Sequence, residues 1–295
     1  MNIAPECFPC VLRRLLSIAG RITSDPWLKH KLLGAAMTDL AAVERDTTPA
    51  EVMRRAAELV TRTLGAADPF QAERHAWFEE LLPVQDKLRD RILRAPKPLF
   101  AALEAAARSN VFDDETLSAA AIRGELQQVL TGALVTTEAA AFALSDYDLF
   151  EADLAGAQSL FFLHDSGPEL LFDRLLIEAM VARAPKLRVT SVVRAQPILL
   201  DADLDDSERA GLAKTAGVVD VITPGIHTLG LPLNECTREF RTAFESADLV
   251  LAKGQAHFET VVGCGKRAYF LFRVKCGVMA AVHGMKVGDL AFFRG

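Results

Sequence analysis

The chain has 295 residues, of which 51% are hydrophobic and 24% charged, enough to bury a sizeable core in one large or two smaller domains. Its net charge of -6 and the lack of a dense Lys/Arg cluster argue against nucleic acid as a partner. No apolar run approaches the roughly 20 residues that cross a bilayer, and the start "MNIAPECFPCVLRR" lacks the order of a signal peptide. We therefore expect a cytoplasmic protein without membrane contact.

Residues 1–125 carry apolar side chains at the three-and-four spacing of amphipathic helices. Three pairs, Asp25-Pro26, Thr48-Pro49 and Asp68-Pro69, each offer an N-cap followed by a proline at the first helical position. A further helix ends near Asn110, a residue type that tolerates the left-handed conformation. We expect this helical region to cap one side of a cleft formed with residues 126–295.

From about residue 154 the chain alternates short apolar runs with helical segments. The runs are "AQSLFFLHD", "LRVTSVVR", "VVDVIT", "ADLVLAKG" and "RAYFLFRV". This alternation is typical of a parallel sheet with crossover helices. The predicted fold class is α/β, a mostly parallel Rossmann-like α/β/α sheet with an attached N-terminal helical region.

Charged residues follow several of these runs, at the edge where open α/β sheets bind ligands. Asp165 follows the first run, Arg194 and then Asp201 the second, and Lys253 ends the fourth. Two carboxylates from neighbouring strands are costly to bury together unless a cation lies between them, and hard oxygen ligands suit Mg or Mn. Lys253 and Arg194 could then hold an anion such as a phosphate against the metal.

The segment "HDSGPELLFD" joins the first strand to a helix that starts at Pro168. Asp165, Glu169 and Asp173 follow at intervals of four and crowd around the helix start. The helix dipole alone explains an acid at Glu169, but it does not require Asp165. Asp165 is therefore the stronger candidate for chemistry.

Four segments, "HDSGPELLFD", "VVRAQPILLDADLDD", "ADLVLAKGQAHFET" and "VKCGVMAAVHGMKVGD", occur in the order and spacing of a known family. The chain resembles the bacterial and archaeal branch of the damage-control phosphatases, also called domain of unknown function 89 or ARMT-like. "ECFPCVLRR" and "ARSNVFD" extend the resemblance to the N-terminal half. It implies a metal-dependent phosphatase of small phosphate monoesters, such as sugar phosphates or damaged phosphometabolites, using Mn, Co, Ni or Mg.

The resemblance also implies roles for individual residues. The implied metal ligands are Asp165, Ser166 and Asp201, and the implied catalytic residues are Asp165, Glu169, Asp173 and Lys253. The implied substrate-binding residues are Arg194, Lys253, Gln255 and His257. Lys253 is the expected phosphate-binding cation in this assignment.

At Ser166, Leu200 and His257 the chain departs from the family, which usually has asparagine there. Each change removes an amide that could bind metal or substrate. Ser166 still offers a hydroxyl, and His164 or His257 could supply a nitrogen ligand that favours a softer metal. A shifted substrate and lost activity are both compatible with these changes. His164 borders Asp165 and is a candidate for lining the active site.

Two other features have ordinary explanations. The five cysteines are an odd number, which favours reduced thiols, and Cys7 and Cys10 are more simply packed thiols than half of a zinc site. The acidic run around Asp203, Asp205 and Asp206 is predicted to be an N-cap and a solvated first helical turn.

Two alternative functions remain at this stage. One is a carboxyl methyltransferase that uses S-adenosylmethionine, although "HDSGPE" lacks the glycine fingerprint of dinucleotide-binding sites. The other is a non-catalytic family member that binds a phosphorylated metabolite. The sequence does not determine the oligomeric state.

Overall fold

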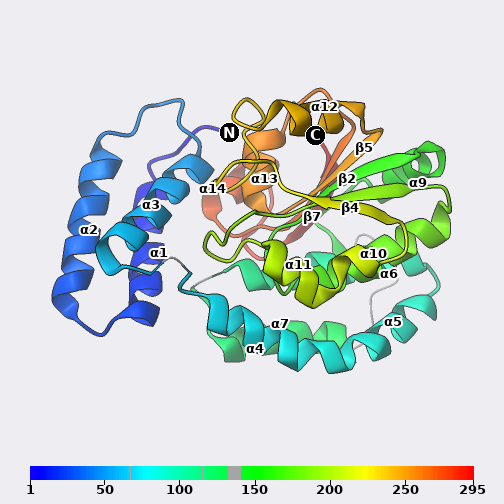
Figure 1. Cartoon of the computed structure of the whole chain (residues 1–295), viewed down its shortest axis with the longest axis horizontal. Coiled ribbons are helices and arrows are strands. Elements are labelled where there is room, and N and C mark those ends of the chain that lie inside the picture. Colours follow the sequence, from blue (N-terminus) through cyan, green and yellow to red (C-terminus); the bar gives the residue numbers. More distant parts are fainter. Residues whose placement is uncertain (67, 115, 132–140) are drawn as a thin grey trace.

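The core of the protein is a β-sheet with helices on both faces (Figure 1). The computed structural model describes residues 1–66, 68–114, 116–131 and 141–295, and within them the sheet has seven strands. Along the chain these are β1 (Leu144–Ser145), β2 (Ser159–Leu163), β3 (Arg188–Val192), β4 (Val218–Ile222), β5 (Leu249–Lys253), β6 (Ala268–Arg273) and β7 (Leu290–Arg294). The five predicted runs form β2 to β6, whereas β1 and β7 were not predicted.

The strands lie in the order β1-β7-β6-β5-β2-β3-β4. All neighbours from β4 to β6 are parallel, and β7 is antiparallel to β6. The chain runs outward from β2 to β3 and β4 and then returns to β5 on the other side of β2. The loops at the carboxyl ends of β2 and β5 therefore diverge, which leaves room for a ligand. The prediction of a mostly parallel Rossmann-like sheet is confirmed.

Successive side chains of each central strand face opposite helical layers. Leu160 and Phe162 of β2 pack into one apolar cluster, and Phe161 and Leu163 pack into the other. The first layer contains α4 (Gln71–Leu81), α5 (Gln85–Leu93), α6 (Pro98–Arg108), α7 (Ala119–Thr131), α9 (Tyr147–Gly156), α10 (Leu170–Arg183) and α11 (Leu204–Ala210). The second contains α12 (Arg238–Ser246), α13 (Gln255–Val261) and α14 (Gly277–His283). Short 3₁₀ turns are η1 (Leu82–Val84), η2 (Ser109–Asp113) and η3 (Leu212–Lys214).

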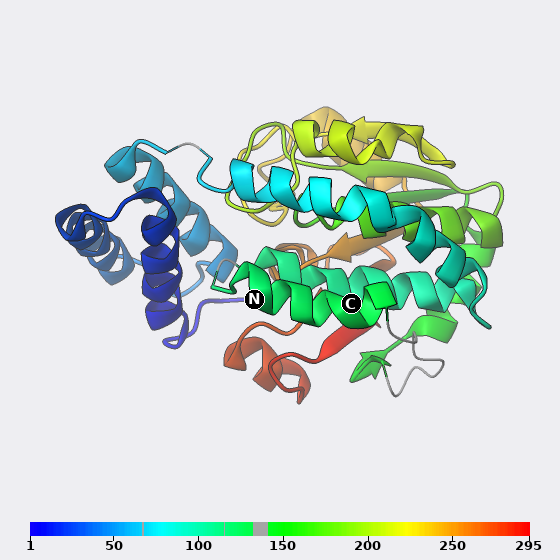
Figure 2. The same ribbon diagram turned by 90° about the horizontal axis from the view of Figure 1, so that it is seen from below.

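The first three helices form a separate apolar cluster beside the sheet. They are α1 (Cys7–Ile22), α2 (Pro26–Ala41) and α3 (Pro49–Leu64), and both ribbon views show them to one side of the other layers (Figures 1 and 2). Ile198, Leu199 and Leu200 from the loop after β3 are buried in the same cluster. This loop continues directly to Asp201.

Two of the four predicted helix starts are confirmed, and the start at Pro168 was wrong by two residues, because α10 begins at Leu170. Asp25 accepts a hydrogen bond from the amide of Trp27 at 2.8 Å, and α2 begins at Pro26. Thr48 caps α3 in the same way. The third start was wrong by two residues, because the Asp68 carboxylate accepts from the amide of Phe70 within a turn, and α4 begins only at Gln71.

Asp68 instead belongs to a buried ionic cluster around Arg74 of α4. The Arg74 guanidinium lies 2.8 Å from Asp68, 3.3 Å from Asp203 and 2.9 Å from Asp206. Asp203 is the N-cap of α11, as predicted, and forms a reciprocal capping box with Asp206. The prediction that these acids are solvated was wrong for Asp203 and Asp206, which are buried against Arg74, and holds for exposed Asp205.

The helices of the N-terminal region thus fall into two groups. Helices α1 to α3 form their own apolar cluster, and α4 to α7 cover one face of the sheet. A division of the chain at residue 125 stays a prediction; α7 spans that position. In the described ranges no helix combines the length and the apolar composition that a membrane span requires.

Candidate active site

Three aspartates meet beyond the carboxyl ends of the central strands. Asp165 follows β2, Asp201 lies on the loop after β3, and Asp113 ends η2. One carboxylate oxygen of each lies within 4.8 Å of those of the other two. Asp165 and Asp201 are buried and Asp113 is half-buried. We call Asp113, Asp165 and Asp201 the acidic triad.

The backbone fixes two members of this triad against each other. Ser166 and Asp201 form an isolated antiparallel bridge, and the amide of Ala202 donates to the carbonyl of Asp165 at 2.7 Å. Gly254 lies beneath Asp165 with a φ of +85°, and a Cβ atom at this position would lie 2.1 Å from the Asp165 carboxyl carbon. Only glycine leaves room for the carboxylate here.

The electrostatics of the triad fit a bound cation. Burial, and then the nearby charge of Asp113, raise the pKa of Asp165 well above its usual range, against the opposing effect of Lys275. Burial raises the pKa of Asp201 to about 6, although Arg194 opposes this shift. Clustered, buried carboxylates are stabilised by a divalent cation, and three hard oxygen donors suit Mg²⁺ or Mn²⁺.

A second group of acids, Glu169 and Asp173, follows Asp165 along the chain at intervals of four residues. Both carboxylates are paired with the ammonium group of Lys253. The Lys253 ammonium lies 2.5 Å from Glu169 and 2.6 Å from Asp173, and it donates to the Ser109 hydroxyl at 3.3 Å. These three acceptors match its three hydrogens. Burial lowers the pKa of Lys253, but Asp173 and Glu169 raise it by more, so the net shift is upward. We call Glu169, Asp173 and Lys253 the lysine network.

Asn110 joins the two groups. Its Nδ2 donates to Asp165 at 2.7 Å and to the Glu169 carboxylate at 3.0 and 3.2 Å, and its Oδ1 accepts from the amide of Arg273 at 3.0 Å. The side chain is fully buried. Asn110 was expected only to end a helix, and the segment "ARSNVFD" was the one sequence signal of a further role.

His164 extends the lysine network. Its Nδ1 lies 2.7 Å from Asp173, and its ring stacks on Phe162. Burial lowers the pKa of His164, although Asp173 opposes this, so the neutral ring donates from Nδ1 to the carboxylate. Its buried Nε2 has no hydrogen-bond partner among the described residues. His164 therefore contacts Asp173 of the lysine network, and its role in lining the active site stays a prediction.

Arg194 and His257 form a buried chain of contacts that begins at Asp201. Arg194 Nε donates to Asp201 at 2.8 Å, and its Nη2 lies 3.2 Å from His257 Nε2. His257 Nδ1 lies 2.7 Å from the carbonyl oxygen of Lys253. Since a carbonyl only accepts, Nδ1 carries the proton and Nε2 accepts from Arg194. Burial, and then Arg194, lower the pKa of His257 to about 3, so the ring is neutral.

Lys275, two residues past β6, is a cation in contact with two members of the triad. Its ammonium contacts the Asp113 carboxylate, donates to the Asp113 carbonyl at 2.8 Å and lies 4.0 Å from Asp165. Its side chain keeps 15% of its exposure. Burial lowers the pKa of Lys275, but Asp113, Asp165 and Glu169 raise it by more. Lys275 is thus charged beside the two carboxylates, a contact that its place after β6 did not suggest.

The sequence matches the damage-control phosphatase ARMT1-like domain over residues 3–291. The chain belongs to this family. It is 28% identical to a damage-control phosphatase of Archaeoglobus fulgidus, with 98% of each chain covered. It is 29% identical to a damage-control phosphatase of Pyrococcus horikoshii, over 100% of this chain and 98% of the relative.

A solved structure of a DUF89 family protein from Pyrococcus horikoshii has the same fold. The two structures superpose with a TM-score of 0.82 at 26% identity, covering 100% of this chain and 99% of the other. The expected membership in the damage-control phosphatase family and the expected fold are therefore both confirmed.

The three departures expected within the damage-control phosphatase family have different surroundings. The Ser166 hydroxyl is buried and donates to Glu169 at 2.8 Å, so its oxygen lone pairs remain as acceptors. Leu200 packs against α1 to α3, and its carbonyl accepts from the amide of Gly167 at 3.1 Å. His257 contacts Arg194 and the main chain. A metal role for Ser166 and substrate contact by His257 stay predictions.

Gln255 holds the segment that carries Lys275. Its Oε1 accepts from the amide of Lys275 at 3.2 Å, and its Nε2 donates to Glu259 at 3.2 Å and to the sulfur of Cys276 at 3.6 Å. The role of Gln255 in substrate binding stays a prediction.

All five cysteines are free thiols in the structure. Cys7 is half-buried, and burial raises the pKa of its thiol.

Proposed function

We propose that this member of the damage-control phosphatase family is a metal-dependent hydrolase of phosphate monoesters of small metabolites, either damaged phosphometabolites or sugar phosphates. Family membership supports a phosphatase of damaged metabolites. The observation that carries the metal dependence is the acidic triad at the switch point between β2 and β5, where three carboxylates meet. As part of this proposal the enzyme acts in the cytoplasm.

In this proposal Asp113, Asp165 and Asp201 hold the metal, with Ser166 as a neighbouring hydroxyl oxygen. Mn²⁺, Co²⁺, Ni²⁺ and Mg²⁺ all accept carboxylate ligands. When bound, the metal supplies Lewis-acid activation of a phosphoryl oxygen and of a water molecule. Asn110 fixes the orientation of Asp165 by its hydrogen bond to that carboxylate.

The phosphate oxygens of the substrate would contact Lys275 and Arg194. Lys275 retains some exposure beside Asp113 and Asp165, and Arg194 approaches from the side of Asp201. Both cations would offset negative charge that grows on the transferred phosphoryl group. The fully buried Lys253 was expected in this role, but its three hydrogens face Ser109, Glu169 and Asp173. We propose that Lys253 acts by holding those two carboxylates in place.

Glu169 is the proposed proton carrier. Burial raises its pKa, against the lowering effect of Lys253, and it accepts from both Asn110 and Ser166. A carboxylate with a raised pKa is a stronger base than an ordinary carboxylate, which suits proton transfer. Asp173 would support Glu169 through their shared contact with Lys253.

The test is metal-dependent phosphate release from a panel of phosphate esters by the wild type, Asp165→Ala and Asp201→Ala. Both variants should lose metal binding and at least about a hundredfold in kcat, while circular dichroism shows that they fold. Asp148→Ala, at an exposed position on α9, is the matched control. Undiminished activity in both triad variants would disprove the assignment.

The same measurements separate the two alternative functions. Metal binding without turnover of any ester would favour a non-catalytic member of the family. Binding of S-adenosylmethionine, measured by calorimetry, would favour a carboxyl methyltransferase.

A further inference from the structure

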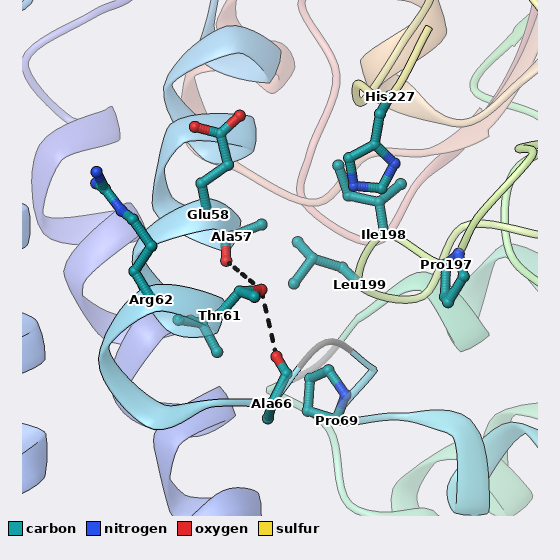
Figure 3. A pocket seen from close by; sticks show the side chains of 11 residues that line it. Ala57, Glu58, Thr61, Arg62, Ala66, Pro69, Pro197, Ile198, Leu199 and His227 are labelled. Atoms are coloured by element: carbon teal, nitrogen blue, oxygen red, sulfur yellow. Dashed lines mark hydrogen bonds between the residues drawn. The ribbon is translucent and has the colours of Figure 1, made fainter. Parts of the chain in front are cut away.

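A cavity of about 390 Å³ lies between α3 and the loop after β3 (Figure 3). Ala57 and Val60 of α3 form one wall, Ile198 and Leu199 of the loop form the other, and His227 lies at one edge. A cavity of this volume is large enough for a small metabolite. None of the three triad aspartates lines it.

The cavity wall and the triad nevertheless share one turn of the chain. The amide of Asp201 donates to the carbonyl of Ile198 at 3.1 Å, which closes the four-residue turn 198–201. The first and fourth Cα atoms of such a turn lie within about 7 Å of each other. Ile198 lines the cavity and Asp201 supplies a triad carboxylate, so this one turn contributes to both sites.

This turn has an unfavourable backbone conformation. Leu199 has a φ of +50°, a left-handed conformation that is unfavourable for a residue with a Cβ atom. The Leu199 carbonyl accepts from Arg74 at 3.2 Å, and Arg74 is itself held by the buried ionic cluster. Figure 3 shows the Leu199 side chain directed toward α3 across the cavity. Strain of this kind is retained where the surroundings fix it, and it is concentrated at ligand sites.

The interior of the cavity offers few groups to a sugar. The Thr61 hydroxyl is directed to the carbonyls of Ala57 and Ala66, at 3.4 and 3.3 Å. The charged ends of Glu58 and Arg62 point away from Leu199 (Figure 3). Hydroxyl groups buried without partners would cost free energy, whereas an apolar group gains from burial against Val60, Ile198 and Leu199.

We propose that this cavity binds the apolar part of the substrate's leaving group, so that the preferred substrates are phosphate monoesters of an apolar or aromatic alcohol. This inference rests on the proposed function, since it requires the phosphoryl group to bind at the triad. On hydrolysis the oxygen of water bonds to phosphorus, the ester P–O bond breaks, and the alcohol leaves with a proton. The turn 198–201 then separates the site of reaction from the site that selects the substrate.

The experiment compares the binding of phenylphosphonate and methylphosphonate to the Mn²⁺-loaded protein by calorimetry. Neither probe can be hydrolysed, so binding is measured apart from catalysis. Wild-type protein should bind phenylphosphonate about tenfold more tightly, because the ring buries apolar surface. Ala57→Phe fills the cavity and should reduce this ratio to about one. The same substitution at Ala120, exposed on α7, should leave the ratio at about ten.

Each result of these binding measurements either supports or overturns the proposed binding of the leaving group in the cavity. Equal binding of the two probes by the wild type, or a ratio that Ala57→Phe does not reduce, would overturn it. Phenylphosphonate that inorganic phosphate fails to displace would also overturn it, because the ring would then bind apart from the phosphate site. A failure of the proposed function is distinguishable, since it would appear as absent hydrolysis of p-nitrophenyl phosphate even with the preference for phenylphosphonate present.

Discussion

The acidic triad and the lysine network are neighbouring groups of mostly buried acids that differ in where their cations lie. The lysine network has two carboxylates around an ammonium group whose three hydrogens all have acceptors. The triad has three carboxylates, and its cations Lys275 and Arg194 lie at its edge. An ammonium group whose hydrogens all have acceptors needs no further ion, whereas carboxylates that face one another repel, and a bound cation can relieve that repulsion.

Loss of the ammonium group should have the largest effect on stability. Lys253→Met leaves Glu169 and Asp173 buried without a cation, and we expect a loss of about 3 to 5 kcal/mol in the free energy of unfolding, measured with urea. Lys87→Met, at an exposed position on α5, should change it by less than about 0.5 kcal/mol. A small effect of Lys253→Met would show that Glu169 and Asp173 do not need the ammonium group.

The triad should make the metal-free protein less stable as the pH rises. Burial raises the pKa of Asp201 from 3.8 to about 6, so the folded protein favours the protonated carboxyl group. The contribution of Asp201 to the free energy of unfolding is therefore full below about pH 4 and is lost as the pH rises through 6. The shift corresponds to about 3 kcal/mol. The difference in free energy of unfolding between wild type and Asp201→Asn should follow this course. Excess Mn²⁺ should reverse it, and a difference independent of pH would contradict the comparison.

Neutralising one acid in each group should act in opposite directions. Without metal, Asp165→Asn removes a repelled carboxylate and should stabilise the protein by about 1 to 2 kcal/mol while weakening Mn²⁺ binding. Asp173→Asn removes a partner of Lys253 and should destabilise it. Urea denaturation of both variants, after metal is removed with a chelator, measures the change in free energy of unfolding. A change of the same sign in both variants would contradict the proposed difference between the triad and the lysine network.

The smallest expected effect concerns the contact of His257 with Arg194. Asparagine places an amide near the Nδ1 position and keeps the contact with the Lys253 carbonyl, whereas glutamine reaches the Nε2 position and keeps the acceptor for Arg194. His257→Asn should weaken Mn²⁺ binding about tenfold, and His257→Gln should restore most of it. If both variants bind Mn²⁺ equally, His257 does not act through Arg194.

The sequence predicted the parts of the site that follow strands. Asp165, Asp201 and Lys253 were found because parallel strands end at one edge, and Glu169 and Asp173 because of their helical spacing. Asp113, Asn110 and Lys275 were missed because their partners are distant in sequence: Asn110 bonds to Asp165 and Arg273, 55 and 163 positions away. Helical periodicity carries no information about such contacts.

The burial and the hydrogen-bond partners of the predicted residues could not be predicted from the sequence either. Nothing local indicates that the hydrogens of Lys253 are fully used, or that Asp203 and Asp206 are buried against Arg74. These properties depend on which element of the fold packs over each strand end. The fold class was more predictable than the pairing of charges, because apolar periodicity repeats along the chain and a single ion pair does not.

Gly254 has no side chain that could take part in chemistry, yet the Asp165 carboxyl carbon lies 2.1 Å from where its Cβ atom would stand. In a survey of all single substitutions, position 254 should therefore be as intolerant as a metal ligand. A mutational map alone would count it among the reactive residues. At this position the absence of a methyl group, rather than the presence of a functional group, is what the carboxylate requires.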